Sequence, residues 1–226
     1  MARILRYIFI AAISFTLCFP AQGKTSKYRV EVEMPPAKLL NGFGVGVDLV
    51  GAGMWLTGAR FGSLEAMARL NLLEKYFPVF ELGIGKCDRE GEEQQTKFHA
   101  QSPYFRIGLD YCLTQKRNGN RLFLGARYGF TSQTYDYSNE AFQDPIYEAS
   151  TTPLHFEGLR GKTHWLELCV GIETRLWSIV RLGFSIRFKP RLSTDYSEHG
   201  EPWYVPGFGK NGITTWGGSV NLMFDL

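Results

Sequence analysis

The residues best suited to catalysis lie in one polar segment near the C-terminus. Ser197 and His199, with Asp195 or Glu198 beside them, are the residue types of a nucleophile, a base and an orienting acid. Such a set acts only when nucleophile and base lie within hydrogen-bond distance, and spacing along the chain does not establish that distance. We therefore assign no catalytic residue and keep an enzymatic role as an alternative.

Two glycine motifs and three cysteines stand in the wrong context for a cofactor or a metal. Residues 207–212 read GxGxxG, but a dinucleotide site needs this motif between a strand and a helix, and a long loop precedes it here. Residues 161–163 end like a phosphate-binding loop, but Phe156 stands where its first glycine belongs. We expect no cofactor and no metal, and we expect the remaining cysteines to fill apolar space: Cys87, Cys112 and Cys169.

The N-terminus has the pattern of an export signal. Arg3 and Arg6 precede an apolar run at residues 7–18, and Ala21-Gln22-Gly23 places small residues at a cleavage site. We predict a signal peptide over residues 1–23. Without its two arginines, the chain keeps 23 of its 25 basic residues against 22 acidic ones, and this near balance argues against a nucleic-acid partner.

The strongest pattern in the sequence is an alternation of apolar and polar residues. At residues 164–176 and 180–192 the even positions are mainly apolar, and the odd positions are charged, polar or small. A period of two kept over so many residues predicts β-strands with one apolar and one polar face. The same test finds eight strands, at residues 43–49, 64–72, 78–85, 105–112, 122–130, 164–176, 180–192 and 215–226.

Short and long connections alternate between these strands. Tight turns are expected near Glu74, Asn118 and Ser178, and the first connection, near Gly58, is a short exception. The long polar connections lie at roughly residues 88–102, 136–162 and 194–212. Short turns on one side and long loops on the other, with aromatic residues near both strand ends, are typical of outer-membrane barrels. We predict an all-β fold, an eight-stranded antiparallel up-and-down transmembrane β-barrel over residues 42–226, after a periplasmic lead-in over residues 24–41.

The polar face of the strands carries as many acids as arginines, Arg175 among them. An arginine that faces lipid at mid-depth costs about 2–4 kcal/mol, whereas in a narrow eight-stranded barrel it can be paired inside. A two-residue turn at Asn118-Gly119 and three-residue turns at residues 74–76 and 177–179 would fix the register. The interior pairs predicted from these turns are Asp110 with Arg127, Arg69 with Glu81, Glu167 with Lys189 and, diagonally, Glu173 with Arg181.

One loop segment combines prolines and aromatic residues. Two prolines stiffen it, and its rings would be exposed unless they fold over the barrel mouth or meet a partner. We favour folding over the mouth and keep the segment as a candidate partner loop, with the residues Pro202, Trp203, Tyr204, Pro206 and Phe208.

Several of these segments resemble a family of uncharacterised outer-membrane proteins of Bacteroidota. The resemblance covers essentially the whole mature chain. It rests on YFPVFELG at 76–83, PYFRIGLDY at 103–111, NRLFLGARYGF at 120–130, HWLEL at 164–168 and PWYVPGFGKN at 202–211. The resemblance implies an outer-membrane barrel with no known active site, linked to outer-membrane biogenesis complexes.

Three functions are compatible with the sequence. The first is a non-enzymatic, integral outer-membrane barrel with a charge-plugged interior, a structural or docking subunit of an envelope complex that contacts outer-membrane lipid and protein partners. The alternatives are a lipid-modifying enzyme at the outer rim and a small ligand binder or narrow pore. We favour the first, because twelve charged side chains would fill a barrel of this size.

Overall fold

The computed structural model describes residues 39–226, apart from 92–95, 116–119, 141–152 and 198–199. The chain divides into two compact units, Met1–Pro36 and Ala37–Leu226, and every described element belongs to the second. The predicted signal peptide and nearly all of the predicted lead-in lie outside the described residues.

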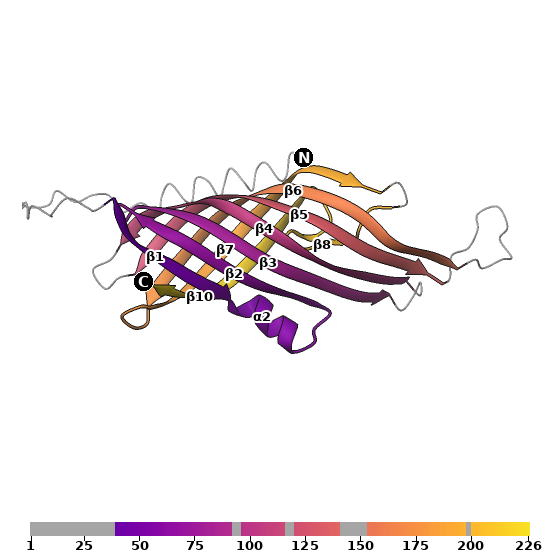
Figure 1. Ribbon diagram of the computed structural model, residues 1–226, viewed down its shortest axis with the longest axis horizontal. Coiled ribbons are helices and arrows are strands. Elements are labelled where there is room, and N and C mark those ends of the chain that lie inside the picture. Colours follow the sequence, from indigo (N-terminus) through magenta and orange to yellow (C-terminus); the bar gives the residue numbers. More distant parts are fainter. Residues whose placement is uncertain (1–38, 92–95, 116–119, 141–152, 198–199) are drawn as a thin grey trace, which may run out of the picture. The chain divides into compact units, whose positions relative to one another are not determined.

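Eight antiparallel strands form a closed barrel in the second unit (Figure 1). The order around the barrel is β1-β10-β7-β6-β5-β4-β3-β2, so each strand pairs with its neighbour in the chain and β1 pairs with β10 to close the ring. The strands are β1 (Leu40–Asp48), β2 (Phe61–Leu72), β3 (Tyr76–Gly91), β4 (Thr96–Gln115), β5 (Arg121–Asn139), β6 (Leu154–Arg175), β7 (Val180–Tyr196) and β10 (Thr214–Asp225). The predicted all-β fold of eight antiparallel strands is confirmed, and each predicted strand overlaps an observed one.

Two connections contain elements that the alternation did not predict. The helix α2 (Leu49–Leu56) follows β1 directly and lies on the outside of the strands in Figure 1. A small hairpin of β8 (Tyr204–Val205) and β9 (Gly209–Lys210) forms within the connection between β7 and β10. Among the described residues, no helix has the length and apolar character needed to cross a membrane.

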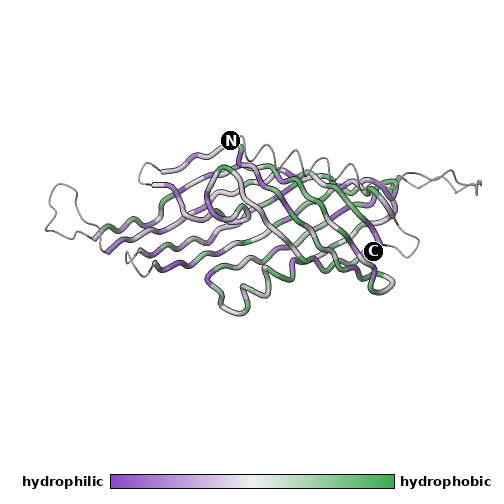
Figure 2. The backbone as a smooth tube through the Cα atoms, turned by 180° about the vertical axis from the view of Figure 1, so that it is seen from behind, coloured by the Kyte–Doolittle hydropathy of each residue, from purple (hydrophilic) through white to green (hydrophobic). Residues whose placement is uncertain are grey.

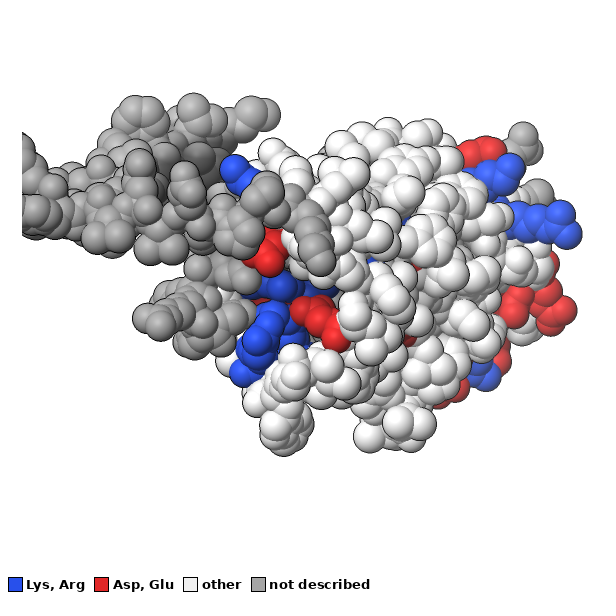
Figure 3. Space-filling view, turned by 60° about the vertical axis from the view of Figure 1, so that its left-hand side comes forward, with Lys and Arg blue, Asp and Glu red and all other residues white. Residues whose placement is uncertain are grey.

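Buried and exposed residues alternate along the strands, so alternate side chains face the inside and the outside of the barrel. Figure 2 shows hydrophilic and hydrophobic residues alternating along several strands. In β3, for example, Val79 and Glu81 are buried while Phe80 and Leu82 are exposed. The exposed side chains along the middle of the strands are mostly leucine, isoleucine, valine and phenylalanine. The face in Figure 3 accordingly shows charged side chains at both ends of the barrel and a broad uncharged band between them.

The turn between β2 and β3 lies one residue earlier than predicted. Leu72 pairs with Tyr76, so the turn is made by residues 73–75, and Leu73 and Glu74 both have φ of 55°. A turn moved by one residue shifts the pairing by two, which keeps every side chain on its predicted face but changes its neighbour. Arg69 therefore lies opposite Val79 instead of the predicted Glu81.

The pairing between β4 and β5 also differs by two residues. Gln115 pairs with Arg121, and a bulge between Cys112 and Thr114 shifts the register, so that Asp110 lies opposite Gly125. The predicted Asn118-Gly119 turn lies outside the described residues. The turn between β6 and β7 has its predicted length, because the Leu176 amide donates to the Val180 carbonyl around residues 177–179.

Candidate functional site

Two glutamates and three arginines close the middle of the barrel. Glu81 of β3 contacts Arg106 Nε at 2.7 Å, Arg127 Nη1 at 3.1 Å and Arg187 Nη1 at 3.1 Å. Glu167 of β6 contacts Arg106 Nη1 at 3.1 Å and Arg187 Nη1 at 3.3 Å. We call these five residues the central layer. They come from five neighbouring strands and are all buried, so they fill the barrel at this level with paired charge.

A hydrogen bond from a buried tryptophan completes the central layer. Trp165 Nε1 donates to Glu167 Oε1 at 2.8 Å, and its ring lies over Gly129. A Cβ at Gly129 would come within 2.2 Å of the Trp165 ring, so this position requires glycine. The close approach lets a large aromatic ring and a buried carboxylate share the narrow interior.

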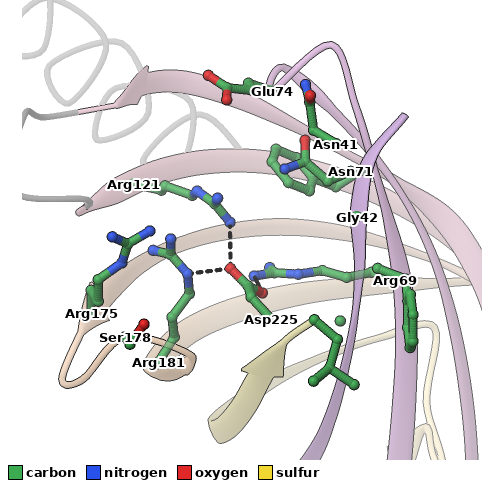
Figure 4. Close-up of a pocket in the computed structure, with 14 residues that line it drawn as sticks. Asn41, Gly42, Arg69, Asn71, Glu74, Arg121, Arg175, Ser178, Arg181 and Asp225 are labelled. Carbon is green, nitrogen blue, oxygen red and sulfur yellow. Dashed lines mark hydrogen bonds and ion pairs between the residues drawn. The ribbon is translucent and has the colours of Figure 1, made fainter. Parts of the chain in front are cut away.

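A second cluster of arginines lies at the turn end of the barrel, where residues 73–75 and 177–179 connect the strands. Figure 4 shows Arg121 and Arg181 reaching Asp225 from one side and Arg69 from the other. Arg69 also binds Glu173 through both guanidinium nitrogens, one of them at 2.9 Å. The cluster leaves an open cavity of about 280 Å³.

Arginine predominates in the lining of this turn-end cavity. Arg69, Arg121, Arg175 and Arg181 face Glu74 and Asp225 across it. Arg175 is exposed and forms no ion pair with another described residue. Arg69, by contrast, is ion-paired with Glu173 and Asp225. Guanidinium groups in this arrangement can hold a carboxylate or a phosphate in bidentate fashion. We refer to this site as the arginine pocket.

The opposite, loop end of the barrel is closed by the segment 200–212, which we call the lid. Phe208 packs edge-on against Trp165 with ring centroids 5.9 Å apart, and Val205 is fully buried beside them. Lys189 Nζ donates to the Gly207 carbonyl at 2.7 Å. The lid thus rests directly above the central layer and is held there by apolar contacts and a charged hydrogen bond.

The outer parts of the strands form a wall beside the lid. β3 to β7 continue past the ends of β2 and β10, and the inner face of the wall carries Phe98 and Tyr135. Tyr204 and Trp203 of the lid pack against this face and against Phe61, whose ring lies 5.7 Å from that of Tyr204. Burial raises the pKa of Tyr204 to about 12.

The structure places the predicted interior residues inside the barrel but changes some of their partners. Asp110 and Arg127 do meet, at 2.9 Å, although they lie diagonally rather than opposite. Lys189 Nζ lies 3.7 Å from Glu167.

The other two predicted pairs are replaced. Arg69 binds Glu173 rather than Glu81, because of the shifted turn and because its side chain reaches across the barrel. Glu81 joins the central layer. Arg181 binds Asp225, and Glu173 lies diagonal to it as predicted but receives its close ion pair from Arg69.

Sequence reasoning missed two members of the arginine pocket and misplaced a third. Arg121 is buried at the start of β5, one residue before the predicted strand, and Asp225 lies in the last predicted strand but is not among the predicted interior pairs. Arg175 was expected inside but lies exposed at the end of β6. If the alternation of inward and outward residues is continued to the ends of the strands, it places Arg121 and Asp225 inside the barrel.

The candidate partner loop is folded into the barrel mouth. Pro202, Pro206 and Phe208 are buried, and Trp203 and Tyr204 are half-buried against the wall. The rings bury their apolar area inside the barrel mouth, so a role for this segment as a partner loop stays a prediction. The favoured folding over the mouth describes the observed lid.

The residues considered for catalysis are not assembled in the described part of the chain. Glu198 and His199 lie outside the described residues, while Ser197 and Asp195 stand at the end of β7. Cys87, Cys112 and Cys169 are buried free thiols, and no three His, Cys, Asp or Glu side chains gather as a metal site in the described ranges.

Comparison with known proteins places the chain in a family but assigns it no activity. Neither a curated protein nor a solved structure matches the sequence significantly. Residues 4–224 match a family described as a domain of unknown function, DUF6048. Since this match spans nearly the entire sequence, the chain belongs to the DUF6048 family.

Proposed function

We propose that this protein is an integral outer-membrane barrel of a Gram-negative bacterium of the Bacteroidota, exported by a cleaved signal peptide, that serves as a non-conducting structural or docking subunit of an envelope complex. The observation that carries the proposal is the inversion of ordinary burial. Leucine, isoleucine and phenylalanine are exposed along the strands, while arginine and glutamate fill the interior. Such a distribution is costly in water and favourable in lipid.

The central layer argues against a transport role. Glu81 and Glu167 are fully buried by the arginines that surround them, and the lid closes the loop end above them. An ion that crossed this layer would have to break several buried ion pairs, each costly to separate in a site removed from water. A closed interior suits a subunit whose working surfaces lie outside the barrel.

The outward face of the wall is the best candidate for a docking surface. It stands beyond the apolar band on one side only, because β2 and β10 end earlier than β3 to β7. Its outward side chains are polar and exposed, for example Lys97, Gln101 and Thr134. An extended polar strand face outside the lipid offers both side chains and rigidity to a protein partner.

Membrane insertion and closure are tested on the purified full-length chain. Folded barrels of this kind resist dodecyl sulphate, so we expect a band that migrates differently before and after boiling, and recovery in the outer-membrane fraction. Planar-bilayer recordings should show no stepwise conductance. Recovery in the soluble fraction would overturn the membrane proposal, and steady single-channel steps would overturn the closed interior.

Docking is tested by photo-cross-linking in intact cells. A benzophenone amino acid at Gln101 or Thr134 should give protein adducts, whereas the same group at Leu168, in the apolar band, should give none. If neither wall position yields an adduct and the protein migrates as a lone monomer in mild detergent, the docking role is rejected while the membrane location stands.

A further inference from the structure

The ring of strands has a gap at its loop end because β1 is short. β1 pairs with β2 only as far as Val47 and Ala66, and with β10 only as far as Asp48 and Asn221. β2 continues to Phe61 with β3 alone, and β10 begins at Thr214 with β7 alone. Within the described residues, no strand therefore joins the first part of β2, residues 61–65, to the first part of β10.

Asp48 and the start of α2 set the lower edge of this gap. The Asp48 carboxylate accepts from the Gly51 amide at 2.9 Å and from the Val220 amide of β10 at 3.2 Å. It thereby caps the helix and replaces the missing strand partner of Val220. A Cβ at Gly51 would lie 2.2 Å from Ser63 Oγ, so the first turn of α2 fits closely against β2.

A cavity of about 370 Å³ opens above Asp48. Its sides are Met54 of α2, Ser63 and Glu65 of β2, and residues 216–219 of β10, and its floor includes Arg187 and Lys189. We call it the lateral cleft. Gly217 and Gly218 bring no side chains, so the β10 backbone itself borders the cleft, and open backbone edges in a membrane protein occur where they line a polar cavity.

The rim of the lateral cleft is apolar. Trp216 of β10 is 70% exposed and Met54 of α2 is 39% exposed, and α2 carries no charged residue. The cleft lies at the loop-end margin of the apolar band, because the outward residues of β3 change from Ile84 to Lys86 at this level. Trp55 of α2 lies under Lys86, 5.1 Å from its ammonium, as aromatic residues do in the headgroup region.

The interior of the cleft is polar and carries more cations than acids. Arg106, Arg187 and Lys189 face Asp48 and Glu65 across it. Glu65 Oε1 is buried, lies 3.8 Å from Arg187 Nη2 and accepts no hydrogen bond, so the cleft offers a hydrogen-bond acceptor as well as positive charge. A ligand that matches both the positive charge and the Glu65 acceptor needs an anionic group and hydrogen-bond donors close together in one polar headgroup.

We propose that the lateral cleft binds the phosphorylated headgroup of an outer-leaflet lipid that also carries hydroxyl or ammonium donors, while its acyl chains lie against α2 and Trp216. This inference rests on the membrane location proposed above. The phosphate is attracted by Lys189 and Arg187, and a headgroup donor reaches Glu65 Oε1. Lys189 also holds the lid, so an occupied cleft and a closed lid share one side chain.

Native mass spectrometry of the full chain extracted from membranes in mild detergent tests the proposal. The wild type should retain one phosphorus-containing lipid. Gly217→Phe fills the cleft from its β10 side and should lower the retained fraction at least tenfold. Ala66→Phe adds the same ring on the outward face of β2, away from the cleft, and should retain the lipid.

The gel shift on boiling reports insertion and folding of each variant separately, so a failed membrane proposal and a failed lipid site give different results. If Gly217→Phe does not fold, a benzophenone amino acid at exposed Trp216 serves instead. It should cross-link the retained lipid in detergent, whereas one at Trp177, equally exposed at the turn end, should not. A wild type without bound lipid, a lipid without phosphorus, or retention unchanged by Gly217→Phe would overturn the proposal.

Discussion

Arg69 of β2 and Glu173 of β6 form a two-pronged ion pair across the inside of the barrel, although their strands are not neighbours. Both side chains are buried, and Asp225 and Arg121 extend the pair into the arginine pocket. The pair ties opposite walls of the barrel together, so it resists any flattening of the ring. Removing this ion pair should therefore lower the stability of the whole barrel.

Arg69→Met should destabilise the barrel by about 3–5 kcal/mol, because it leaves the Glu173 carboxylate buried without its main counter-charge. Urea unfolding of the protein in micelles, followed by the gel shift on boiling, measures this change. Arg175→Met is the matched control, since Arg175 is exposed and makes no ion pair with another described residue, and should change stability by less than about 0.5 kcal/mol. Equal effects of the two variants would contradict the assigned pair.

A double-mutant cycle isolates the interaction itself. Glu173→Gln alone should also destabilise the barrel, whereas Arg69→Met combined with Glu173→Gln should cost less than the sum, with a coupling energy of about 2–3 kcal/mol. The cycle is measured from the same urea midpoints. Additive effects would mean that the two residues do not interact in the membrane.

Gly129→Ala should destabilise the barrel by about 1–3 kcal/mol, because its new methyl group would lie 2.2 Å from the Trp165 ring. In the Trp165→Leu background, the same substitution should cost much less. Gly53→Ala, whose Cβ meets nothing within 4 Å in α2, should be neutral or slightly stabilising. Thermal loss of the fast-migrating folded band measures all three, and an unchanged midpoint for Gly129→Ala would refute the tight contact.

Phe208→Ala should loosen the lid, because it removes the ring that packs against Trp165 inside the barrel mouth. A loss of about 3 kcal/mol in lid docking corresponds to roughly a hundredfold faster tryptic cleavage after exposed Lys210. Ile213→Ala, at a residue already 77% exposed beyond the lid, should leave the cleavage rate unchanged. Similar rates for all three proteins would show that the lid is not held by Phe208.

The lid should also open at high pH. The pKa of Tyr204 is raised from 10 to about 12 by burial, so its neutral form stabilises the closed lid below pH 10 and this contribution disappears as the pH rises through 12. Acrylamide quenching of tryptophan fluorescence should therefore increase over this range. Tyr204→Phe cannot ionise and should lose this component, and an identical profile in the variant would exclude Tyr204 as its cause.

The faces of the strands could be predicted from sequence because they depend only on local geometry. Side chains alternate with a period of two, so the parity of Glu81, Arg127 and Glu167 places them inside whatever the exact pairing. The register is less secure, since a turn of the same length moved by one residue along the chain changes every partner by two residues. The turn at residues 177–179 was predicted correctly, whereas the one at 73–75 was not, because the alternation gives no sign that Leu73 and Glu74 adopt positive φ.

The helix α2 and the lid could not be anticipated from alternation. α2 is uncharged and apolar all round, so its sequence reads like an extension of β1, and only the Asp48 cap and the contact with Ser63 turn it into a helix. The lid has the composition of an exposed aromatic loop. Its burial depends on the wall and on Trp165, which are contributed by distant strands.

The sequence by itself determined that eight amphipathic strands would place charge on one face and apolar side chains on the other, since that follows from the two-residue repeat. Only the tertiary structure decided which charged side chains form ion pairs and where the ring of strands has a gap. Closure of the ring brings Arg69 within reach of Glu173 across a space only as wide as the side chains that fill it. The early end of β1 leaves the gap beside β10, because the length of one strand matters only once its two neighbours are known.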